Sequence, residues 1–335
     1  MISKKYAGPH PGQGLRVLTV TNMYPTPSRP SYGTFVATQV ESLRTAGLVV
    51  DVHFIDGRSS RWAYAGAVRA LRRRLRSADY SLVHAHYGYS ALYPLLLGNI
   101  PVVVTFHGSD VLIGGRGLEE RRQWLKAKLR NFVAARAGAI IVQTQQMKEV
   151  LGLDKARVIP MGIDLDQFRP LDRASCRRQL GYEQTERIAL FPYHPERPEK
   201  GFLLADSAMD LVRRTIPDAR LDVVSAAASS QMPLHYNAAD CLLMTSAREG
   251  SPNAVKEALA CNLPVVSTDC GDVAERLSGV RRCAVVDRSP EAVAAAILDV
   301  LSVPDPRSDG REHLAGLDLQ TTARRIIGVY RDLLP

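Results

Sequence analysis

The stretch DCLLMTSAREGSPNAVKEALACNLPVVSTD, Asp240–Asp269, shows how the whole chain is built. DCLLMTS is a continuous apolar run typical of a buried strand, and PVVSTD is a second one. Between them, Ser251 is a good N-cap and Pro252 fits the first helical position, so a helix is predicted from Asn253 to about Cys261. A strand, a helix and a second strand in this order predict parallel strands in an α/β sheet.

The same alternation recurs along the chain. Apolar runs predict strands at 15–24, 49–56, 81–87, 101–107, 138–144 and 157–164, and a second series at 187–193, 220–226, 240–246, 264–269 and 283–287. The sequence therefore predicts an α/β protein with two tandem Rossmann-like domains, each a doubly wound parallel sheet. The predicted parts are a flexible N-terminal tail (1–14), an N-terminal domain (15–168), a C-terminal domain (169–318) and a C-terminal helix (319–335) that packs back toward the first domain.

Composition narrows the class of protein. The 335 residues are 46% hydrophobic and 23% charged, which is ordinary for a soluble globular chain. No signal peptide is apparent, and the most apolar region, 91–106, is interrupted by proline and glycine, so it predicts a helix and a strand rather than a membrane span. The five cysteines form no CxxC or Cys/His pattern, which indicates reduced thiols in an intracellular protein with no metal framework.

The net charge of +9 is unevenly distributed. Residues 61–76 hold six arginines and no acid, and residues 116–136 add a second basic cluster around Trp124. A nucleic acid, anionic lipid headgroups or a phosphorylated substrate would each fit this charge, and so would a merely solvated helix face. No zinc-finger or RNP signature accompanies it, which argues against nucleic acid.

Polar stretches follow most of the predicted strands. They include NMYPTPSRPSYGT, HGSD, HPERPEKG, REGSPN and CGD. In open parallel sheets, ligands bind outside the carboxyl ends of the strands. Two such domains facing each other would place a site in the cleft between them.

The segment EGSPNAVKEAL, Glu249–Leu259, places one carboxylate on each side of a predicted helix start. The first amides of a helix lack intrahelical partners and suit a phosphate or diphosphate, and Gly250 lets the backbone approach closely. Glu249 then lies beside whatever the outer phosphate carries, and Glu257 is placed to accept hydrogen bonds from ribose hydroxyls. The spacing fits a nucleotide diphosphate. A capped surface helix with two exposed acids is the alternative.

Several motifs in one order carry a family resemblance. REGSPNAVKEALACNLPVVSTDCGD resembles the E-x7-E region of the retaining glycosyltransferases of family 4, which have the GT-B fold. VTNMYPTPSRPSYGTFVATQVESLRTAG resembles their first glycine-bearing loop and helix. SLVHAHYG, VVVTFHGSDVL, VIPMGIDLDQFRP and FPYHPERPEKGF resemble further signatures in the same order. The resemblance covers roughly residues 15–330.

The resemblance implies roles for individual residues. Glu249 would hold donor-sugar hydroxyls, Glu257 the nucleotide ribose, and Lys200 with Arg197 the leaving diphosphate, whose growing negative charge fixed cations stabilise. His107, Lys200 and Glu249 would form the catalytic set. The residues implied to bind the donor are Gly33, Arg197, Lys200, Glu249, Gly250, Ser251, Pro252, Asn253 and Glu257.

Simpler interpretations stay open for several of these residues. Lys200 could be an ordinary surface lysine, His107 a core histidine and Gly33 only a turn residue. Asp110 could contact the acceptor, although a helix N-cap is the favoured role. His84 and His86 flank Ala85 at a strand end; we place them on alternate faces and interpret them as structural.

The chain departs from the family in its second domain. Between Val224 and Asp240 only SAAASSQMPLHYNAA intervenes, so about one β/α unit is predicted to be missing, near the nucleotide base. The choice between a UDP- and a GDP-sugar therefore stays open. Arg197 lies three residues before Lys200, closer than the usual family spacing. The Asp-x-Asp at 164–166 lies in the interdomain phrase and is interpreted as structural.

The resulting prediction is a metal-independent, nucleotide-sugar-dependent hexosyltransferase acting on a glycan or lipid-linked acceptor in cell-surface polysaccharide or glycolipid assembly. The rivals are an epimerase or hydrolase on the same fold, and a non-catalytic scaffold that binds a sugar, a membrane or a protein. No cofactor, metal or nucleic acid is predicted. The expected location is cytoplasmic and peripheral on the inner membrane leaflet. The residues predicted on the acceptor or membrane side are Asp110, Arg69, Arg72, Arg73, Arg74 and Arg76.

Overall fold

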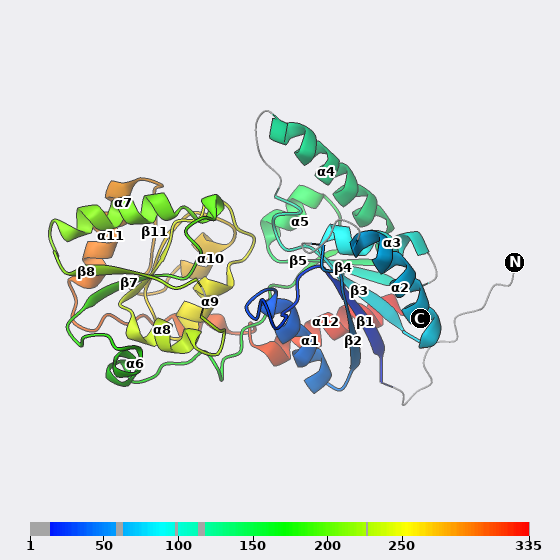
Figure 1. Cartoon of the computed structure of the whole chain (residues 1–335), viewed down its shortest axis with the longest axis horizontal. Coiled ribbons are helices and arrows are strands. Elements are labelled where there is room, and N and C mark those ends of the chain that lie inside the picture. Colours follow the sequence, from blue (N-terminus) through cyan, green and yellow to red (C-terminus); the bar gives the residue numbers. More distant parts are fainter. Residues whose placement is uncertain (1–13, 58–62, 98–99, 113–117, 226, 335) are drawn as a thin grey trace, which may run out of the picture. The chain divides into compact units, whose positions relative to one another are not determined.

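The computed structural model describes residues 14–57, 63–97, 100–112, 118–225 and 227–334. The predicted N-terminal tail therefore lies, but for residue 14, outside the described residues. The chain folds into two compact units (Figure 1). Unit 1 comprises the residues up to Gly162 together with Leu319 onward, and unit 2 runs from Ile163 to Asp318. The sequence placed the change between the two halves near Phe168.

Unit 1 is built around a six-stranded parallel sheet of order β2-β1-β3-β4-β5-β6. The strands are β1 (Arg16–Thr21), β2 (Val49–Phe54), β3 (Leu82–His86), β4 (Val102–Thr105), β5 (Ala139–Val142) and β6 (Ala156–Val158). The helices are α1 (Thr34–Thr45), α2 (Ala63–Ser77), α3 (Gly88–Leu97), α4 (Leu118–Arg136), α5 (Gln145–Leu151) and α12 (Leu319–Leu333).

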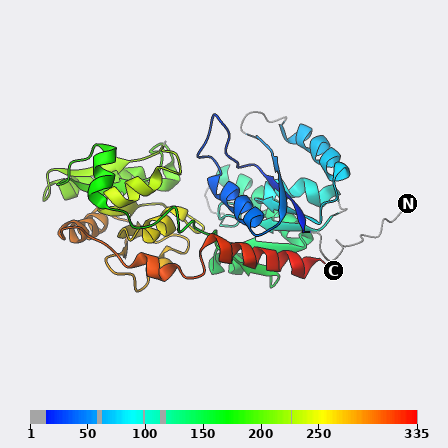
Figure 2. The same cartoon turned by 90° about the horizontal axis from the view of Figure 1, so that it is seen from below.

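The two faces of this sheet have separate cores. Alternate strand residues such as Val83 and Val104 pack against α2, α3, α4 and α5, and the intervening residues such as Leu82 and Val103 pack against α1 and α12. The C-terminal helix α12, red in Figure 2, thereby completes unit 1. Burial on both faces explains why the strands read as continuous apolar runs.

Unit 2 contains a five-stranded parallel sheet of order β11-β10-β9-β7-β8. Its strands are β7 (Arg187–Phe191), β8 (Ala219–Val223), β9 (Cys241–Met244), β10 (Val265–Thr268) and β11 (Ala284–Val286). Its helices are α6 (Arg173–Leu180), α7 (Phe202–Arg213), α8 (Met232–Ala238), α9 (Asn253–Ala260), α10 (Val273–Leu277) and α11 (Pro290–Leu301), with short 3₁₀ turns η1 (Pro198–Lys200) and η2 (Gly310–Leu314).

The topology confirms the predicted α/β class with two Rossmann-like sheets. Between β8 and β9 the described residues form only helix α8. Among the described residues, no strand pairs with the outer side of β8, which is the edge strand of this sheet. In the six-stranded Rossmann order 3-2-1-4-5-6, the third strand lies beside the second. Here β8 holds the position of the second strand, so the third strand would lie at the β8 edge. The shortening inferred from the sequence therefore falls at the β8 edge.

Each sheet has a topological switch point beside its first strand. In unit 2 the chain leaves β7 for β8 on one side and returns to β9 on the other, and in unit 1 the same reversal separates β1 from β3. Loops at the carboxyl ends of the two strands flanking such a point diverge and leave a crevice for a ligand. The loops after β7 and β9 carry most of the residues predicted to bind a nucleotide.

Candidate functional site

The loops after β7 and β9 are joined at the switch point of unit 2 by an ion pair. Lys200, at the end of η1, donates from Nζ to Oε1 of Glu249 in the loop after β9. The two side chains are only 8% and 17% exposed, and Nζ of Lys200 lies 4.0 Å from the ring centroid of Tyr193. Lys200 is therefore not an ordinary surface lysine, because its charge is held in a fixed, largely dehydrated position.

The turn that carries Lys200 is fixed to the end of β9 by Thr245. The Thr245 hydroxyl is within hydrogen-bonding distance of the carbonyls of Lys200 (3.2 Å) and Gly201 (2.9 Å). Gly201 has a positive φ of 72°, and a Cβ there would lie 2.2 Å from the Thr245 carbonyl oxygen. The amide of Ala247 also donates to the Glu199 carbonyl at 2.8 Å. Only glycine permits this close packing, which sets the position of the lysine.

Helix α9 begins beside this ion pair without a side-chain cap. The N-cap is Pro252 and the first helical residue is Asn253, so the predictions of Ser251 as N-cap and Pro252 as the first helical residue are wrong. The Ser251 hydroxyl instead donates to Oδ2 of Asp272 at 2.8 Å, which draws it away from the helix amides. An uncapped helix start with its partial positive charge suits an anion.

Two further features surround the start of α9. A Cβ on Gly271, whose φ is +61°, would lie 2.0 Å from the carbonyl oxygen of Gly250, so two loop backbones cross in contact. The side-chain oxygen of Asn253 is buried and has no hydrogen-bond partner within the described part of the chain. A buried acceptor without a donor is costly in a finished core, and a ligand hydroxyl or amide would satisfy it.

Glu257 lies one turn into α9 and is held by a buried tyrosine. The Tyr236 hydroxyl, on α8, donates to Oε2 of Glu257 at 2.8 Å. Burial raises the pKa of the Glu257 carboxyl, and the hydrogen bond from Tyr236 opposes that rise. Burial also lowers the pKa of the neighbouring Lys256 to about 8, with Asp272 acting against the change. The hydrogen bond from Tyr236 to Oε2 therefore sets the orientation of the Glu257 carboxylate.

Sequence reasoning missed Tyr236 and two other residues. Tyr236 stands in the short segment between Val224 and Asp240, to which the sequence assigned no binding role, although a buried tyrosine hydroxyl usually needs a partner. Thr245 was missed because its partners lie more than 40 residues earlier in the chain. Arg288, which follows β11, donates from Nη1 to the Thr245 carbonyl at 2.6 Å and adds a cation at this edge of the sheet. Its position after a strand was the available signal.

Arg197 is placed differently from Lys200. Its guanidinium is largely exposed and donates to Oε1 of Glu199 at 2.6 and 2.8 Å. Although Arg197 and Lys200 lie only three residues apart, the Arg197 side chain is in solvent and the Lys200 side chain is buried. Among the described contacts, Arg197 has no bond to Glu249.

In unit 1, Gly33 is required by the packing of its own loop. It precedes α1 with a φ of 72°, and a Cβ there would lie 2.4 Å from the carbonyl carbon of Met23. The loop after β1 thus folds back on itself at Gly33. This explains the glycine without a ligand.

His107 belongs to a group of stacked histidines. Its Nε2 lies 3.0 Å from Nδ1 of His86, and its ring lies against Tyr87 and Phe35, with centroids 4.6 and 5.0 Å away. His86 and His84 stack with centroids 4.5 Å apart, so they share one face of β3, and the expectation of alternate faces is wrong because residues i and i+2 of a strand point the same way.

His84 and His86 are buried and neutral. His84 Nδ1 lies 2.6 Å from the Tyr330 hydroxyl and its Nε2 lies 2.7 Å from Oγ1 of Thr105, which ties α12 to the sheet. Burial lowers the pKa of His84 to about 3 and that of His86 well below its ordinary value. A neutral His86 must share one proton with His107, so it fixes the orientation of the His107 ring.

Asp110 does not cap a helix, contrary to prediction. Its Oδ1 accepts from the backbone amides of His107 (3.0 Å) and Gly108 (3.1 Å), so it closes the turn after β4. Burial raises the pKa of the Asp110 carboxyl to about 6, and the backbone amides partly counteract that rise. The segment that follows turns rather than beginning a helix at this point.

The predicted arginine group on α2 is divided by the structure. Arg69, Arg72, Arg73 and Arg76 are exposed and, with Ser77, line an open hollow of about 490 Å³. Arg74 instead donates to the Val52 carbonyl at 2.8 Å and lies 3.8 Å from Asp51. Arg74 therefore helps to attach α2 to β2, which distinguishes it from the other four arginines.

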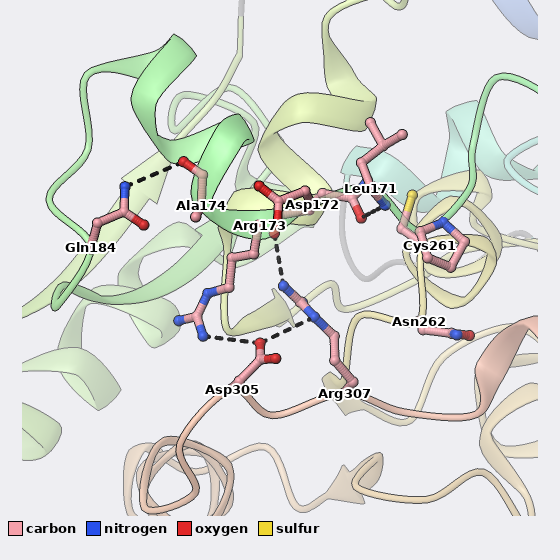
Figure 3. A pocket seen from close by; sticks show the side chains of 11 residues that line it. Leu171, Asp172, Arg173, Ala174, Gln184, Cys261, Asn262, Asp305 and Arg307 are labelled. Atoms are coloured by element: carbon pink, nitrogen blue, oxygen red, sulfur yellow. Dashed lines mark hydrogen bonds and ion pairs between the residues drawn. The ribbon is translucent and has the colours of Figure 1, made fainter.

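Unit 2 has a hollow of its own, of about 500 Å³ (Figure 3). It lies near the amino ends of the strands, opposite the end that carries Lys200. Arg173 and Arg307 project toward Asp305, with ion-pair distances of 3.1 and 3.5 Å. Arg173 also pairs with buried Asp240, which precedes β9. These charges already have partners, and the hollow lies on the side away from Lys200.

Comparison with known proteins places this geometry among the glycosyltransferases. A family model described as Glycosyltransferase Family 4 matches residues 11–167, and one described as Glycosyl transferases group 1 matches residues 206–303. The chain is 24% identical over 356 residues to TuaC of Bacillus subtilis, a glycosyltransferase assigned to teichuronic acid biosynthesis, covering 84% of this chain and 88% of TuaC. It is 28% identical over 306 residues to a D-inositol 3-phosphate glycosyltransferase of Segniliparus rotundus, covering 76% and 67%.

Solved structures share the fold. A sucrose-phosphate synthase from Thermosynechococcus elongatus superposes with a TM-score of 0.81 at 20% identity, covering 96% of this chain and 99% of that one. Anabaena HepE in complex with UDP-glucose gives a TM-score of 0.71 at 16% identity, covering 95% and 100%. At these identities the likeness concerns the two-domain GT-B architecture.

Proposed function

The chain belongs to glycosyltransferase family 4, and from this premise we propose that it transfers a sugar from a nucleotide-diphosphate sugar to a hydroxyl acceptor with retention of the anomeric configuration. The observation that carries the proposal is the buried pair of Lys200 and Glu249 beside the uncapped start of α9, with Glu257 one turn further on. One cation, one helix terminus and two carboxylates match the parts of such a donor.

Each part of the donor has a proposed partner in unit 2. The diphosphate lies at the amides that begin α9 and against Lys200, whose charge stabilises the departing nucleotide. Glu257, oriented by Tyr236, accepts hydrogen bonds from the ribose. Glu249 accepts hydrogen bonds from the sugar hydroxyls. Gly250, Ser251, Pro252 and Asn253 shape the backbone that faces the phosphates.

Donor binding must then exchange the partners of the ion pair. Without ligand, the Lys200 ammonium is neutralised by Glu249. A diphosphate carries more negative charge than a carboxylate, so it competes for Lys200 and frees Glu249 for the sugar. The lysine and the helix dipole supply positive charge that a divalent ion supplies in other transferases, and on this basis we propose metal-independent transfer.

Other residues enter the proposal through the family resemblance. His107, whose ring is held by His86, and Gly33 belong to the donor contacts that the family resemblance implies. Asp110 and the four exposed arginines of α2 (Arg69, Arg72, Arg73 and Arg76) are assigned to the acceptor side. Arg197 supports the diphosphate only if it releases Glu199.

Relatives indicate which donor and acceptor to test first. HepE, whose fold the chain shares, was solved with UDP-glucose, which makes UDP-glucose the first donor to test and a GDP-sugar the second. TuaC supports a glycan or lipid-linked acceptor in cell-surface polysaccharide assembly. We place the enzyme at the cytoplasmic side of the membrane as a peripheral protein. Among the described residues, no helix combines the length and apolarity needed to span a membrane.

The test is release of nucleoside diphosphate from UDP-glucose or GDP-mannose, with and without a bacterial lipid extract as acceptor and with EDTA throughout. The proposal predicts acceptor-dependent release and a radiolabelled lipid product. Lys200→Ala should lower the rate by roughly 100- to 1,000-fold, as loss of a group that stabilises a developing anion does. Release that is independent of acceptor would indicate a hydrolase, and sugar interconversion without release would indicate an epimerase; either result contradicts the proposal.

A further inference from the structure

Helices α2, α3 and α4 form one continuous layer on unit 1. Leu71 of α2, Ala91 of α3 and Val133 of α4 belong to the same buried core on one face of the sheet. In sequence, α3 follows β3 directly, and in space it contacts both α2 and α4 (Figure 1). The outer sides of these helices therefore belong to a single surface.

This surface exposes large apolar side chains. Trp124 and Leu125 of α4 are 56% and 61% exposed, and Leu96 and Tyr89 of α3 are 63% and 45% exposed. Single exposed leucines are common on protein surfaces, but an adjacent tryptophan and leucine on the outer side of one helix are not ordinary solvent-facing residues. They indicate a surface that is covered when the protein works.

The same surface is strongly basic. Arg69, Arg72, Arg73 and Arg76 of α2 surround one hollow and have no acidic partner within the described part of the chain. On α4, the Lys128 ammonium lies 3.8 Å from the centroid of the Trp124 ring. The sequences of α2 and α3 contain no Asp or Glu. The two acids of α4, Glu119 and Glu120, are confined to its first turn.

Exposed aromatic and aliphatic side chains beside cations fit an anionic lipid surface. Tryptophan places its ring at the level of the lipid headgroups, leucine enters the acyl boundary, and lysine and arginine pair with phosphates. A nucleic acid would use the cations but not exposed Leu96 and Leu125. The apolar residues lie on two neighbouring helices, which suits a broad partner such as a membrane.

We propose that the outer surface of α2, α3 and α4 docks on anionic lipid headgroups, with Trp124 and Leu125 inserted into the interface and the α2 arginines bound to lipid phosphates. The inference deepens the proposed function by naming the partner surface of unit 1, but it requires no donor binding in unit 2. A failure of lipid docking would remove the peripheral membrane placement but leave the proposed sugar transfer standing, and a failure of sugar transfer would leave the docking proposal standing.

The test uses the two tryptophans of the chain. Trp62→Phe leaves Trp124 as the sole tryptophan. This variant is titrated at low salt with vesicles of phosphatidylglycerol or of phosphatidylcholine. The expected result is a blue shift of Trp124 emission, and its quenching by brominated acyl chains, with phosphatidylglycerol only. Residue 62 lies outside the described residues, so circular dichroism and a Tm equal to that of the wild type check that the variant is folded.

Matched variants separate insertion from charge. Leu125→Ser should weaken vesicle binding roughly tenfold, since it removes the burial of one large side chain. Each of Arg72→Gln and Arg73→Gln should weaken it roughly fivefold. Leu203→Ser, at a site 81% exposed on unit 2, should leave vesicle binding unchanged.

Four results of the vesicle experiments would overturn the proposal. They are vesicle retention without a change in Trp124 emission, equal binding to both lipids, no binding, and equal losses for Leu125→Ser and Leu203→Ser. Duplex DNA that displaces the protein from phosphatidylglycerol vesicles would assign the surface to nucleic acid and would also overturn it.

Discussion

At the residue scale, the Lys200–Glu249 pair determines how the site responds to a ligand. Both side chains are largely buried, so removing one leaves the other without its counterion. Breaking a buried pair typically costs about 3–5 kcal/mol, whereas exchanging one anion for another costs far less. A phosphate can therefore replace the carboxylate without unfolding the site. The pair is best understood as a cation held ready for an incoming anion.

The first residue-scale prediction concerns the orientation of Glu257. Tyr236→Phe removes the hydroxyl that donates to Oε2 and leaves the buried ring in place. We expect UDP affinity to fall roughly tenfold, in line with the loss of a hydrogen bond to a charged group. The preference for UDP over 2′-deoxy-UDP should shrink as well, because a mobile carboxylate discriminates less between the two sugars. Isothermal titration calorimetry measures both.

The control is Tyr182→Phe in the same unit. Its hydroxyl donates to Oδ2 of Asp222 at 2.7 Å, so the variant loses a similar bond to a carboxylate that has no proposed ligand role. UDP affinity should stay at the wild-type value. If Tyr236→Phe lost affinity equally for UDP and 2′-deoxy-UDP, Tyr236 would only support the fold.

The second residue-scale prediction is a pH dependence. Burial raises the pKa of Asp110 to about 6, from an ordinary value of 3.8. A carboxyl whose pKa is higher in the folded state binds its proton more tightly there, so its ionisation destabilises the fold as pH rises through that range. Asp110→Asn keeps an oxygen for the His107 and Gly108 amides and cannot ionise.

We therefore expect the Tm of Asp110→Asn relative to wild type to rise by roughly 2–4 °C between about pH 5 and about pH 7.5. Differential scanning calorimetry at several pH values measures the difference. A Tm difference that is constant across this range would mean that Asp110 does not titrate there.

At the scale of elements, the Lys200 turn and helix α9 illustrate what local sequence predicts. The bounds of α9 follow closely from apolar spacing, and its C-terminal end at Ala260 lies next to the predicted Cys261. The N-cap of α9 does not follow from the local sequence, because the Ser251 hydroxyl bonds Asp272, which lies 21 residues later. Cap propensity is a local rule, and a distant partner overrides it.

The element-scale prediction tests the packing of the Lys200 turn. Gly201→Ala places a methyl group 2.2 Å from the Thr245 carbonyl oxygen in a backbone of φ +72°. Gly181→Ala is the matched control, since Gly181 has a φ of +71° and open space around its Cβ position. The control should cost about 1–2 kcal/mol of unfolding free energy, and Gly201→Ala an additional ~1–3 kcal/mol.

Urea unfolding measures these free energies, and only Gly201→Ala should also weaken UDP binding, because only that turn positions Lys200. Equal destabilisation by the two substitutions would show that the Thr245 contact does not constrain the turn.

At the scale of the whole molecule, the α/β class and the two-sheet organisation were predictable from the alternation of apolar runs. The short segment between Val224 and Asp240 also indicated the missing β/α unit. Strand order was not readable, because an apolar run does not specify its neighbours. For the same reason, contacts across elements such as Tyr236–Glu257 and Thr245–Lys200 emerged only from the fold.

Sugar transfer as proposed requires that unit 2 bind a nucleoside diphosphate at the start of α9 without a metal ion. The most direct measurement is isothermal titration calorimetry of UDP, GDP and ADP in EDTA, with wild type and Glu257→Ala. We expect one nucleotide to bind with a Kd on the order of micromolar and Glu257→Ala to weaken that binding by roughly 100-fold, as loss of a charged hydrogen-bonding partner does. Absence of binding by all three nucleotides, or equal binding by wild type and Glu257→Ala, would contradict it.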